Sequence, residues 1–288
     1  MVITVGFFDG VHMGHRRVLR ALLERGERAA AVTFWPHPRA VLQQDARDLK
    51  LLSSYEEKLS EIRSAGVRDV RCIDFTREFA SATAEQFIKE CLIDKMGCDC
   101  LVLGYDNRLG SDGLSTGEVA DLCRRMGLEV VVVPPYEVDD VCVSSTCIRR
   151  ALTDGDVALS ARMLGQRYRI KGIVVPGNRL GRTIGFPTAN IDLSFPLKVI
   201  PKNGVYATEV SVNGKQYRGM TNIGVRPTLG SGGTRLIETN IFDFDEDIYG
   251  LEIELGFIAR VRDEKRFDSL EELGKQLRID RHHCFGYN

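Results

Sequence analysis

The sequence predicts an α/β protein of two domains: an N-terminal doubly wound parallel sheet and a C-terminal antiparallel β-barrel with a terminal helix. In the first half, continuous apolar runs of strand length alternate with helical patterns, which indicates parallel strands covered by helices on both faces. From residue 168 onward, segments of alternating apolar and polar residues recur. Turn signals such as Asn213-Gly214 separate several of them, which is typical of antiparallel strands.

In the first half, each predicted strand is a short apolar run, and helical patterns lie between most of these runs. Sheets of this kind bind their ligands at the carboxyl ends of the strands, so we expect functional residues in the loops that follow them. The predicted strands are 2–6, 29–34, 67–73, 98–104 and 129–133, and the predicted helices are 16–24, 55–65, 84–95 and 115–125.

The second half has the period-two pattern of a barrel, and a helical segment connects it to the first half. The predicted barrel strands are 168–175, 205–212, 216–223, 235–242 and 251–261, and the predicted terminal helix is 269–277. Residues 148–164 have a helical pattern with an interruption at Gly155, and no Gly/Ser-rich linker is present. The predicted domains are therefore 1–150 and 168–288, joined by a connecting helix at 151–167.

The composition is that of a globular protein with a sizeable core. The chain has 288 residues, 43% of them hydrophobic and 27% charged, and no apolar run reaches the length of a membrane span. The net charge of -1 gives no general reason to expect nucleic acid or an anionic membrane as a partner. The eight cysteines, seven of them before residue 150, suggest a reducing compartment rather than a disulfide scaffold. We expect a cytoplasmic protein with small-molecule ligands, for which no obligate protein partner is implied.

A glycine-rich segment with two histidines follows the first predicted strand and opens the first predicted helix. Free N–H groups at a helix start bind anions, and glycines let the backbone approach a phosphate closely. His12 and His15 can donate to oxygens that gain charge when a phosphoanhydride bond breaks. The alternative is a glycine-rich turn with two incidental histidines. The candidate nucleotide-binding residues here are Gly6, Phe8, Gly10 and Gly14.

A second polar segment lies at the end of the first domain. Two hydroxyls and a guanidinium at a helix start can hold the phosphates of a nucleotide. Ser145 and Thr146 are therefore candidate nucleotide-binding residues, and Arg149 is a candidate catalytic residue. The alternative is an ordinary helix N-cap followed by a surface arginine.

The second half has a glycine-rich segment at 177–183 that differs from a Walker A motif, because the spacing is one residue short and Arg182 replaces the lysine. The extended segment 181–190 is the better candidate for a nucleotide site. Thr188 and Asn190 offer neutral oxygens on one side of an extended chain. Such oxygens can hold Mg²⁺ between the phosphates of ATP. The alternative is a proline-containing turn of the barrel. The candidate nucleotide-binding residues are Gly181, Arg182, Gly185, Pro187, Thr188 and Asn190, and the last two are also the candidate metal ligands.

These motifs together resemble those of a known family. H-x-G-H at 12–15 and S-S-T-x-x-R at 144–149 resemble the nucleotidylyltransferase superfamily. With T-F-W-P-H-P-R at 33–39 and G-Y-D-N-R-L-G at 104–110, the first half resembles the adenylyltransferase half of prokaryotic bifunctional riboflavin kinase/FAD synthetases. The second half resembles riboflavin kinases through G-R-T-I-G-F-P-T-A-N at 181–190 and N-I-G-V-R-P-T at 222–228.

This resemblance implies two reactions. The C-terminal domain would phosphorylate riboflavin to FMN with ATP and Mg²⁺, and the N-terminal domain would transfer an adenylyl group from ATP to FMN, giving FAD and pyrophosphate. Glu238 occupies the position of the catalytic carboxylate, which can take the proton of a ribityl hydroxyl. By the same resemblance, Asp106, Arg108, Asn222 and Arg226 would bind flavin.

The chain departs from the family pattern in one loop, where Asn107 and Leu109 replace the usual aromatic residues. Either this loop does not touch the isoalloxazine ring closely, or FMN binds more weakly at the synthetase site; the second is the favoured expectation. An amide buried without a partner would cost free energy there. Two other functions stay open: a riboflavin kinase with a weakened or altered adenylyltransferase half, and a flavin-binding protein without turnover.

Overall fold

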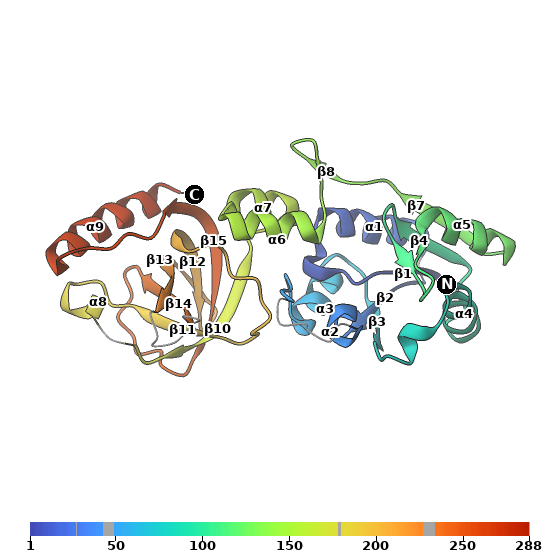
Figure 1. The fold of residues 1–288 in the computed structure, drawn as a ribbon, viewed down its shortest axis with the longest axis horizontal. Helices are drawn as coiled ribbons and strands as arrows, with labels where there is room; N and C mark the ends of the chain where they lie inside the picture. The colour runs from blue at the N-terminus through green and yellow to red at the C-terminus, as the bar shows by residue number, and fades with distance from the viewer. Residues whose placement is uncertain (27, 43–48, 178–179, 227–233, 288) are drawn as a thin grey trace. The chain divides into compact units, whose positions relative to one another are not determined.

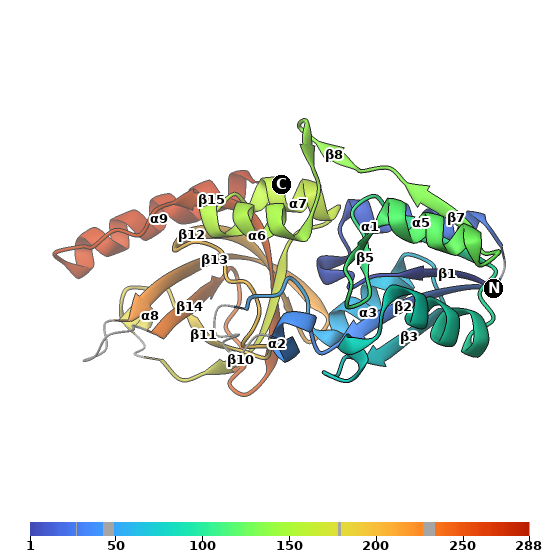
Figure 2. The ribbon, with the colours of Figure 1, turned by 45° about the vertical axis from the view of Figure 1, so that its right-hand side comes forward.

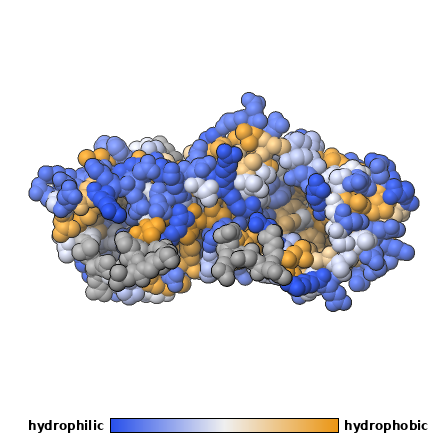
Figure 3. Space-filling model, in the orientation of Figure 1, coloured by the Kyte–Doolittle hydropathy of each residue, from blue (hydrophilic) through white to orange (hydrophobic). Residues whose placement is uncertain are grey.

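The computed structural model describes residues 1–26, 28–42, 49–177, 180–226 and 234–287, except for the side chains of Leu180, Arg226 and Thr234. The chain divides into two compact units, Met1–Ser145 and Thr146–Asn288 (Figure 1). The surface seen in Figure 3 is mostly hydrophilic, with smaller hydrophobic patches between the charged residues.

The first unit is built on a five-stranded parallel sheet in the order β3-β2-β1-β4-β7, as the apolar runs predict. Val2 lies opposite Ala29 on one side and Cys100 on the other, so β1 is the central strand. The strands are β1 (Val2–Val5), β2 (Ala29–Trp35), β3 (Asp69–Asp74), β4 (Cys100–Gly104) and β7 (Glu129–Val133), of which β1, β2 and β3 are labelled side by side in Figure 2.

Helices cover both faces of this sheet, because successive strand residues point to opposite faces. On one face, Val2 and Val102 pack with residues of α1 (Met13–Glu24) and α3 (Tyr55–Ser64). On the other face, Ile3 and Leu101 pack with residues of η3 (Phe87–Lys95), a π-helical segment, and of α5 (Thr116–Arg125). The predicted doubly wound arrangement is confirmed.

The helices of this unit begin where the sequence supplies a capping residue. Ser54, Thr83 and Ser115 each close a capping box with the Glu or Gln three residues later. The predicted helix 84–95 is one turn, α4 (Ala84–Gln86), that continues into η3. The prediction missed several short elements: η1 (Asp9–Val11), α2 (Pro38–Leu42), η2 (Phe79–Ser81), β5 (Arg108–Leu109), β6 (Leu114–Ser115), β8 (Glu137–Val138) and β9 (Val141–Cys142).

The connecting region forms two helices, α6 (Ser145–Asp154) and α7 (Val157–Leu164), rather than one interrupted helix. Gly155 has a φ of +89° at the break, and Asp156 caps α7 by accepting a hydrogen bond from the Leu159 amide at 2.8 Å. The amide of Lys202 donates to the carbonyl of Leu152 at 2.9 Å, so within the second unit the end of α6 is bonded to the segment before β12.

The second unit contains a closed antiparallel barrel in the order β10-β11-β14-β13-β12-β15, which confirms the predicted architecture. Asn213 and Gly214 have φ values of +48° and +77°, as a tight hairpin turn requires. The strands are β10 (Arg169–Val175), β11 (Ala189–Leu193), β12 (Gly204–Val212), β13 (Lys215–Arg226), β14 (Thr234–Ile241) and β15 (Glu252–Arg262), with helices α8 (Leu180–Thr183) and α9 (Leu270–Gly286).

Helix α9 is longer than its predicted range and covers one side of the barrel. Cys284 and Leu277 of this helix pack against Val205 and Met220 of the barrel strands. The prediction missed β11 as a strand, although it treated residues 188–190 as extended chain. Gly185 and Pro187 are typical of a turn, and the strand begins two residues after Pro187, at Ala189.

Candidate active sites

The Gly6–His15 segment of the first unit lies at the carboxyl end of the central strand β1. The carboxylate of Asp9 is buried and accepts from the amides of Leu52 and Ser53, at 2.9 and 3.1 Å. The amide of Gly10 donates to the Ser53 hydroxyl at 3.0 Å, and Gly10 has a φ of +76° that favours glycine. The segment before α3 therefore holds this turn in one shape.

The two histidines lie side by side at the start of α1. His12 is the N-cap, and its Nδ1 accepts from the His15 amide at 3.3 Å. The rings stack with centroids 3.6 Å apart. Burial holds the pKa of His15 well below its usual value, and the neighbouring His12 and Lys58 lower it further. His15 is therefore neutral at pH 7, and among the described residues no group hydrogen-bonds its buried Nδ1.

A buried lysine beside this turn was missed by the sequence analysis. Lys58 of α3 is 1% exposed, and its ammonium donates to the carbonyl of Phe34 at 2.8 Å. The ammonium also lies 4.2 Å from the centroid of the Phe7 ring. Burial lowers its pKa to about 8. The available signal was position, since Lys58 precedes the buried Ile62 by four residues and so lies on the apolar face of the helix.

The remaining residues predicted for the first site are Gly14, Ser145, Thr146 and Arg149. The Ser145 hydroxyl donates to the carbonyl of Asp9 at 2.9 Å, so the structure brings Ser145 to the Gly6–His15 segment. A side chain at Gly14 would place its Cβ 3.2 Å from the His12 ring, so the close approach there favours glycine. Thr146 and Arg149 lie on α6, in the second compact unit, and their part in this site stays a prediction.

The loop that departs from the family pattern has a structural role. The Asn107 amide group donates to the carbonyl of Val5 at 2.8 Å, and its oxygen accepts from the amide of Gly104 at 2.9 Å. Asn107 thus joins the carboxyl ends of β1 and β4. Leu109 is 6% exposed and belongs to the apolar core. The amide is therefore paired, contrary to the concern that it would be buried alone. Asp106 and Arg108 are exposed on the same loop.

In the second unit, β14 separates two cavities. Cavity A, of about 430 Å³, is lined by residues that include Thr239, Ile241 and Tyr249. Cavity B, of about 410 Å³, is lined by residues that include Glu238 and Asn240. Alternate residues of one strand thus face different cavities, as strand geometry requires. Thr188 lines both cavities, so the two meet at this residue.

One candidate metal ligand, Thr188, lies where the cavities meet, and the other, Asn190, follows two residues later. Asn190 is 4% exposed and lies opposite Glu238 across β11 and β14, while Asn222 lies opposite Glu238 on β13. Among the described residues, no hydrogen-bond donor reaches the buried Asn190 Oδ1. An oxygen without a donor beside a carboxylate is suited to a cation, so Asn190 fits Mg²⁺.

The other predicted residues of the second half lie around the same cavities. Gly181 lines cavity B, and a Cβ there would lie 2.1 Å from the carbonyl of Phe186, so the close approach requires glycine. Arg182 and Pro187 line cavity A, and Gly185 is exposed in the turn between them. The side chain of Arg226 lies outside the described residues. Further residues line the cavities without a role predicted from the sequence, among them Glu264, Phe267 and Leu273 in cavity B and Asp247 and Tyr249 in cavity A.

Comparisons with known proteins agree with the division of the chain into two units. Residues 1–147 match the family model of FAD synthetase, and residues 164–286 match that of riboflavin kinase. The chain is 37% identical over 294 residues to the bifunctional riboflavin kinase/FMN adenylyltransferase of Bacillus subtilis, covering 99% of this chain and 92% of that one. It is also 37% identical over 290 residues to the protein of that name from Escherichia coli K12, covering 97% and 90%.

A solved structure of a Streptococcus pneumoniae protein described as a macrolide-efflux protein has the same fold. It is 34% identical, has a TM-score of 0.92, and covers all of this chain and 94% of that one. Within the described residues of the present chain, no helix combines the length and apolar character needed to cross a membrane. By its two family models and its relatives, the chain belongs to the family of bifunctional riboflavin kinase/FMN adenylyltransferases.

Proposed function

We propose that this chain carries out both reactions of its family, the phosphorylation of riboflavin within residues 168–288 and the adenylylation of FMN within residues 1–150. ATP is the co-substrate of both reactions. The observation that carries the proposal furthest is the position of Glu238. It lines cavity B together with Thr188, and Thr188 also lines cavity A. A group phosphorylated in one cavity would therefore meet a phosphate donor held in the other.

For the kinase reaction, we assign cavity B to riboflavin and cavity A to ATP. Glu238 accepts the proton of the terminal ribityl hydroxyl as that oxygen attacks the γ-phosphate, and ADP leaves. Thr188 and Asn190 would hold Mg²⁺, which neutralises phosphate charge when bound. Arg182, on the wall of cavity A, supplies a further positive charge for the phosphates.

For the adenylyl transfer, the Gly6–His15 segment binds the phosphates of ATP. A phosphate oxygen of FMN attacks the α-phosphorus, a P–O bond forms, and pyrophosphate leaves. His12 and His15 donate hydrogen bonds to the oxygens that gain charge during this step. Lys58 adds a fixed positive charge to this edge of the sheet, and Ser145, Thr146 and Arg149 hold the nucleotide.

Chromatography of flavins after incubation with riboflavin, ATP and Mg²⁺ tests the proposal. Formation of FMN followed by FAD is the expected result. FMN without FAD would leave a riboflavin kinase with an altered first unit. Unchanged riboflavin that remains bound to the protein would indicate a flavin-binding protein without turnover and would contradict the proposal.

A further inference from the structure

Glu264 lies on the wall of cavity B, and no part of the proposed kinase reaction uses it. It follows the last barrel strand, and its Oε2 accepts from the side-chain amide of Asn203 at 3.0 Å. Its other oxygen, Oε1, lies against Gly224 of β13, where an added Cβ would be only 2.2 Å away. The glycine therefore leaves the space that this carboxylate oxygen fills.

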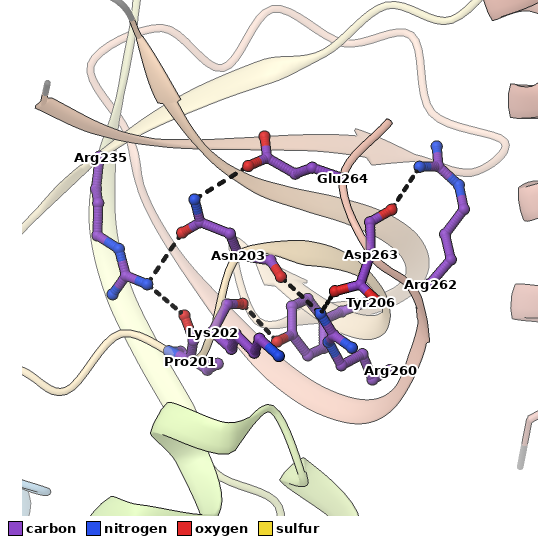
Figure 4. Close-up of polar contacts among 9 residues, drawn as sticks. All are labelled: Pro201, Lys202, Asn203, Tyr206, Arg235, Arg260, Arg262, Asp263 and Glu264. Carbon is purple, nitrogen blue, oxygen red and sulfur yellow. Dashed lines mark hydrogen bonds and ion pairs between the residues drawn. The ribbon is translucent and has the colours of Figure 1, made fainter. Parts of the chain in front are cut away.

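A polar network holds Asn203, and through it Glu264, in one orientation. Figure 4 shows Asn203 between Arg235 and Glu264. The Arg235 guanidinium donates to Asn203 Oδ1 at 3.0 Å and to the carbonyl of Pro201 at 3.1 Å. A guanidinium only donates and a carboxylate only accepts, so the Asn203 amide must present its oxygen to Arg235 and its nitrogen to Glu264.

The other charged residues between positions 260 and 264 have partners different from that of Glu264. Asp263 accepts from Arg260 at 2.7 Å and is absent from the lining of cavity B. Arg262 lines the cavity, but its guanidinium binds the buried Asp280 with two of its nitrogens. Glu264 is thus the carboxylate of this segment that faces cavity B with an oxygen outside the network.

The strand register places Glu264 relative to the reacting end of the cavity. Asn222 lies opposite Glu238, and Gly224, the neighbour of Glu264, lies two residues further along the same strand. Two residues of a strand span about 7 Å. This is close to the length of a ribityl chain measured from its terminal hydroxyl. If that hydroxyl lies at Glu238, Glu264 lies beside the secondary hydroxyls, near the junction with the ring.

We infer that Glu264 binds the secondary hydroxyls of the ribityl chain and so selects flavins that carry a polyhydroxylated chain. This inference rests on the proposed kinase function of the second unit. An ionised carboxylate accepts hydrogen bonds from hydroxyl groups, and such charge-assisted bonds are stronger than neutral ones. Asn203 is the positioning residue, because it orients Glu264 without lining the cavity itself.

Flavin fluorescence quenching tests this inference with two probes. Riboflavin carries the ribityl chain, whereas lumiflavin has the same ring with a methyl group in its place. We expect Glu264→Gln to weaken riboflavin binding roughly tenfold, which is the lower end for a hydrogen bond to a charged group, and to leave lumiflavin binding unchanged. Asp263→Asn is the matched control, and it should leave the binding of both probes unchanged.

The kinetic readout separates binding from chemistry. Glu264→Gln should raise KM for riboflavin and leave kcat within about twofold, because the residue does not touch the reacting atoms. Riboflavin binding within twofold of the wild type, or an equal loss for both probes, would overturn the inference. Failure of the wild-type protein to phosphorylate riboflavin would instead contradict the proposed function, so the two failures are distinguishable.

Discussion

Asn107 joins the carboxyl ends of β1 and β4, and its removal should destabilise the first unit. Asn107→Ala leaves the buried carbonyl of Val5 and the buried amide of Gly104 without their side-chain partners. An unsatisfied buried backbone group costs about 1–3 kcal/mol. The two groups together should therefore lower the free energy of unfolding of the first unit by about 2–4 kcal/mol, after partial relaxation of the loop.

Urea denaturation followed by tryptophan fluorescence measures this change in the full chain, because the single tryptophan, Trp35, lies on β2 of the first unit. Asp106→Ala is the matched control. Asp106 is exposed one position earlier, so its change should stay within about 0.5 kcal/mol. If Asn107→Ala lowers the free energy of unfolding by less than about 0.5 kcal/mol, the structural role is refuted. An Asn107→Phe, Leu109→Phe double variant that keeps wild-type stability and lowers KM for FMN would refute it as well.

Three further predictions follow from the buried charge, the metal ligands and the unit boundary. Lys58 has its pKa lowered to about 8 in the folded state, so between pH 8 and 10 the unfolded chain binds more protons there. The stability of the wild type relative to Lys58→Met should therefore rise over that window in urea titrations. Asn190→Ala should raise the Mg²⁺ concentration for half-maximal kinase activity roughly 10–100-fold without changing that of adenylylation, and an unchanged Mg²⁺ dependence of the kinase would remove Asn190 as a ligand. A fragment beginning at Leu164 should phosphorylate riboflavin. A fragment beginning at Thr146 should also do so and should have a higher Tm, because it keeps the Leu152–Lys202 hydrogen bond. A fragment that folds but is inactive would show that the kinase depends on the first unit.

The architecture was predictable because the burial of a strand determines the pattern of apolar residues within that strand. A strand covered on both faces must be apolar at successive positions, as Val2 and Ile3 are, and such runs alternating with helical patterns indicated the parallel sheet. The hairpin at Asn213 was predictable because few residues adopt a positive φ. Strand β11 was missed because Pro187 is typical of a turn. The chain nevertheless continues as a strand from Ala189, and this strand is needed to close the barrel.

The candidate sites were predictable only where a motif is local. His12 and His15 lie in one turn, and the structure stacks their rings. Lys58 was missed because its position beside the turn depends on the packing of α3 against a segment more than forty residues earlier, which no local pattern encodes. The hydrogen bonds of Asn107 were not predictable, because its partners, Val5 and Gly104, come from two different strands. Long-range contacts of this kind require the fold itself.

The central claim is that two separate sites perform the two reactions, and a crossed measurement on two variants tests it most directly. The initial rates of FMN formation from riboflavin and of FAD formation from FMN are measured for His15→Ala and for Glu238→Gln. His15→Ala should lose roughly 10²-fold or more of the adenylylation rate and keep the kinase rate. Glu238→Gln should lose about 10²–10⁴-fold of the kinase rate and keep adenylylation. Loss of both activities in either folded variant, or retention of the activity assigned to the changed residue, would contradict the account.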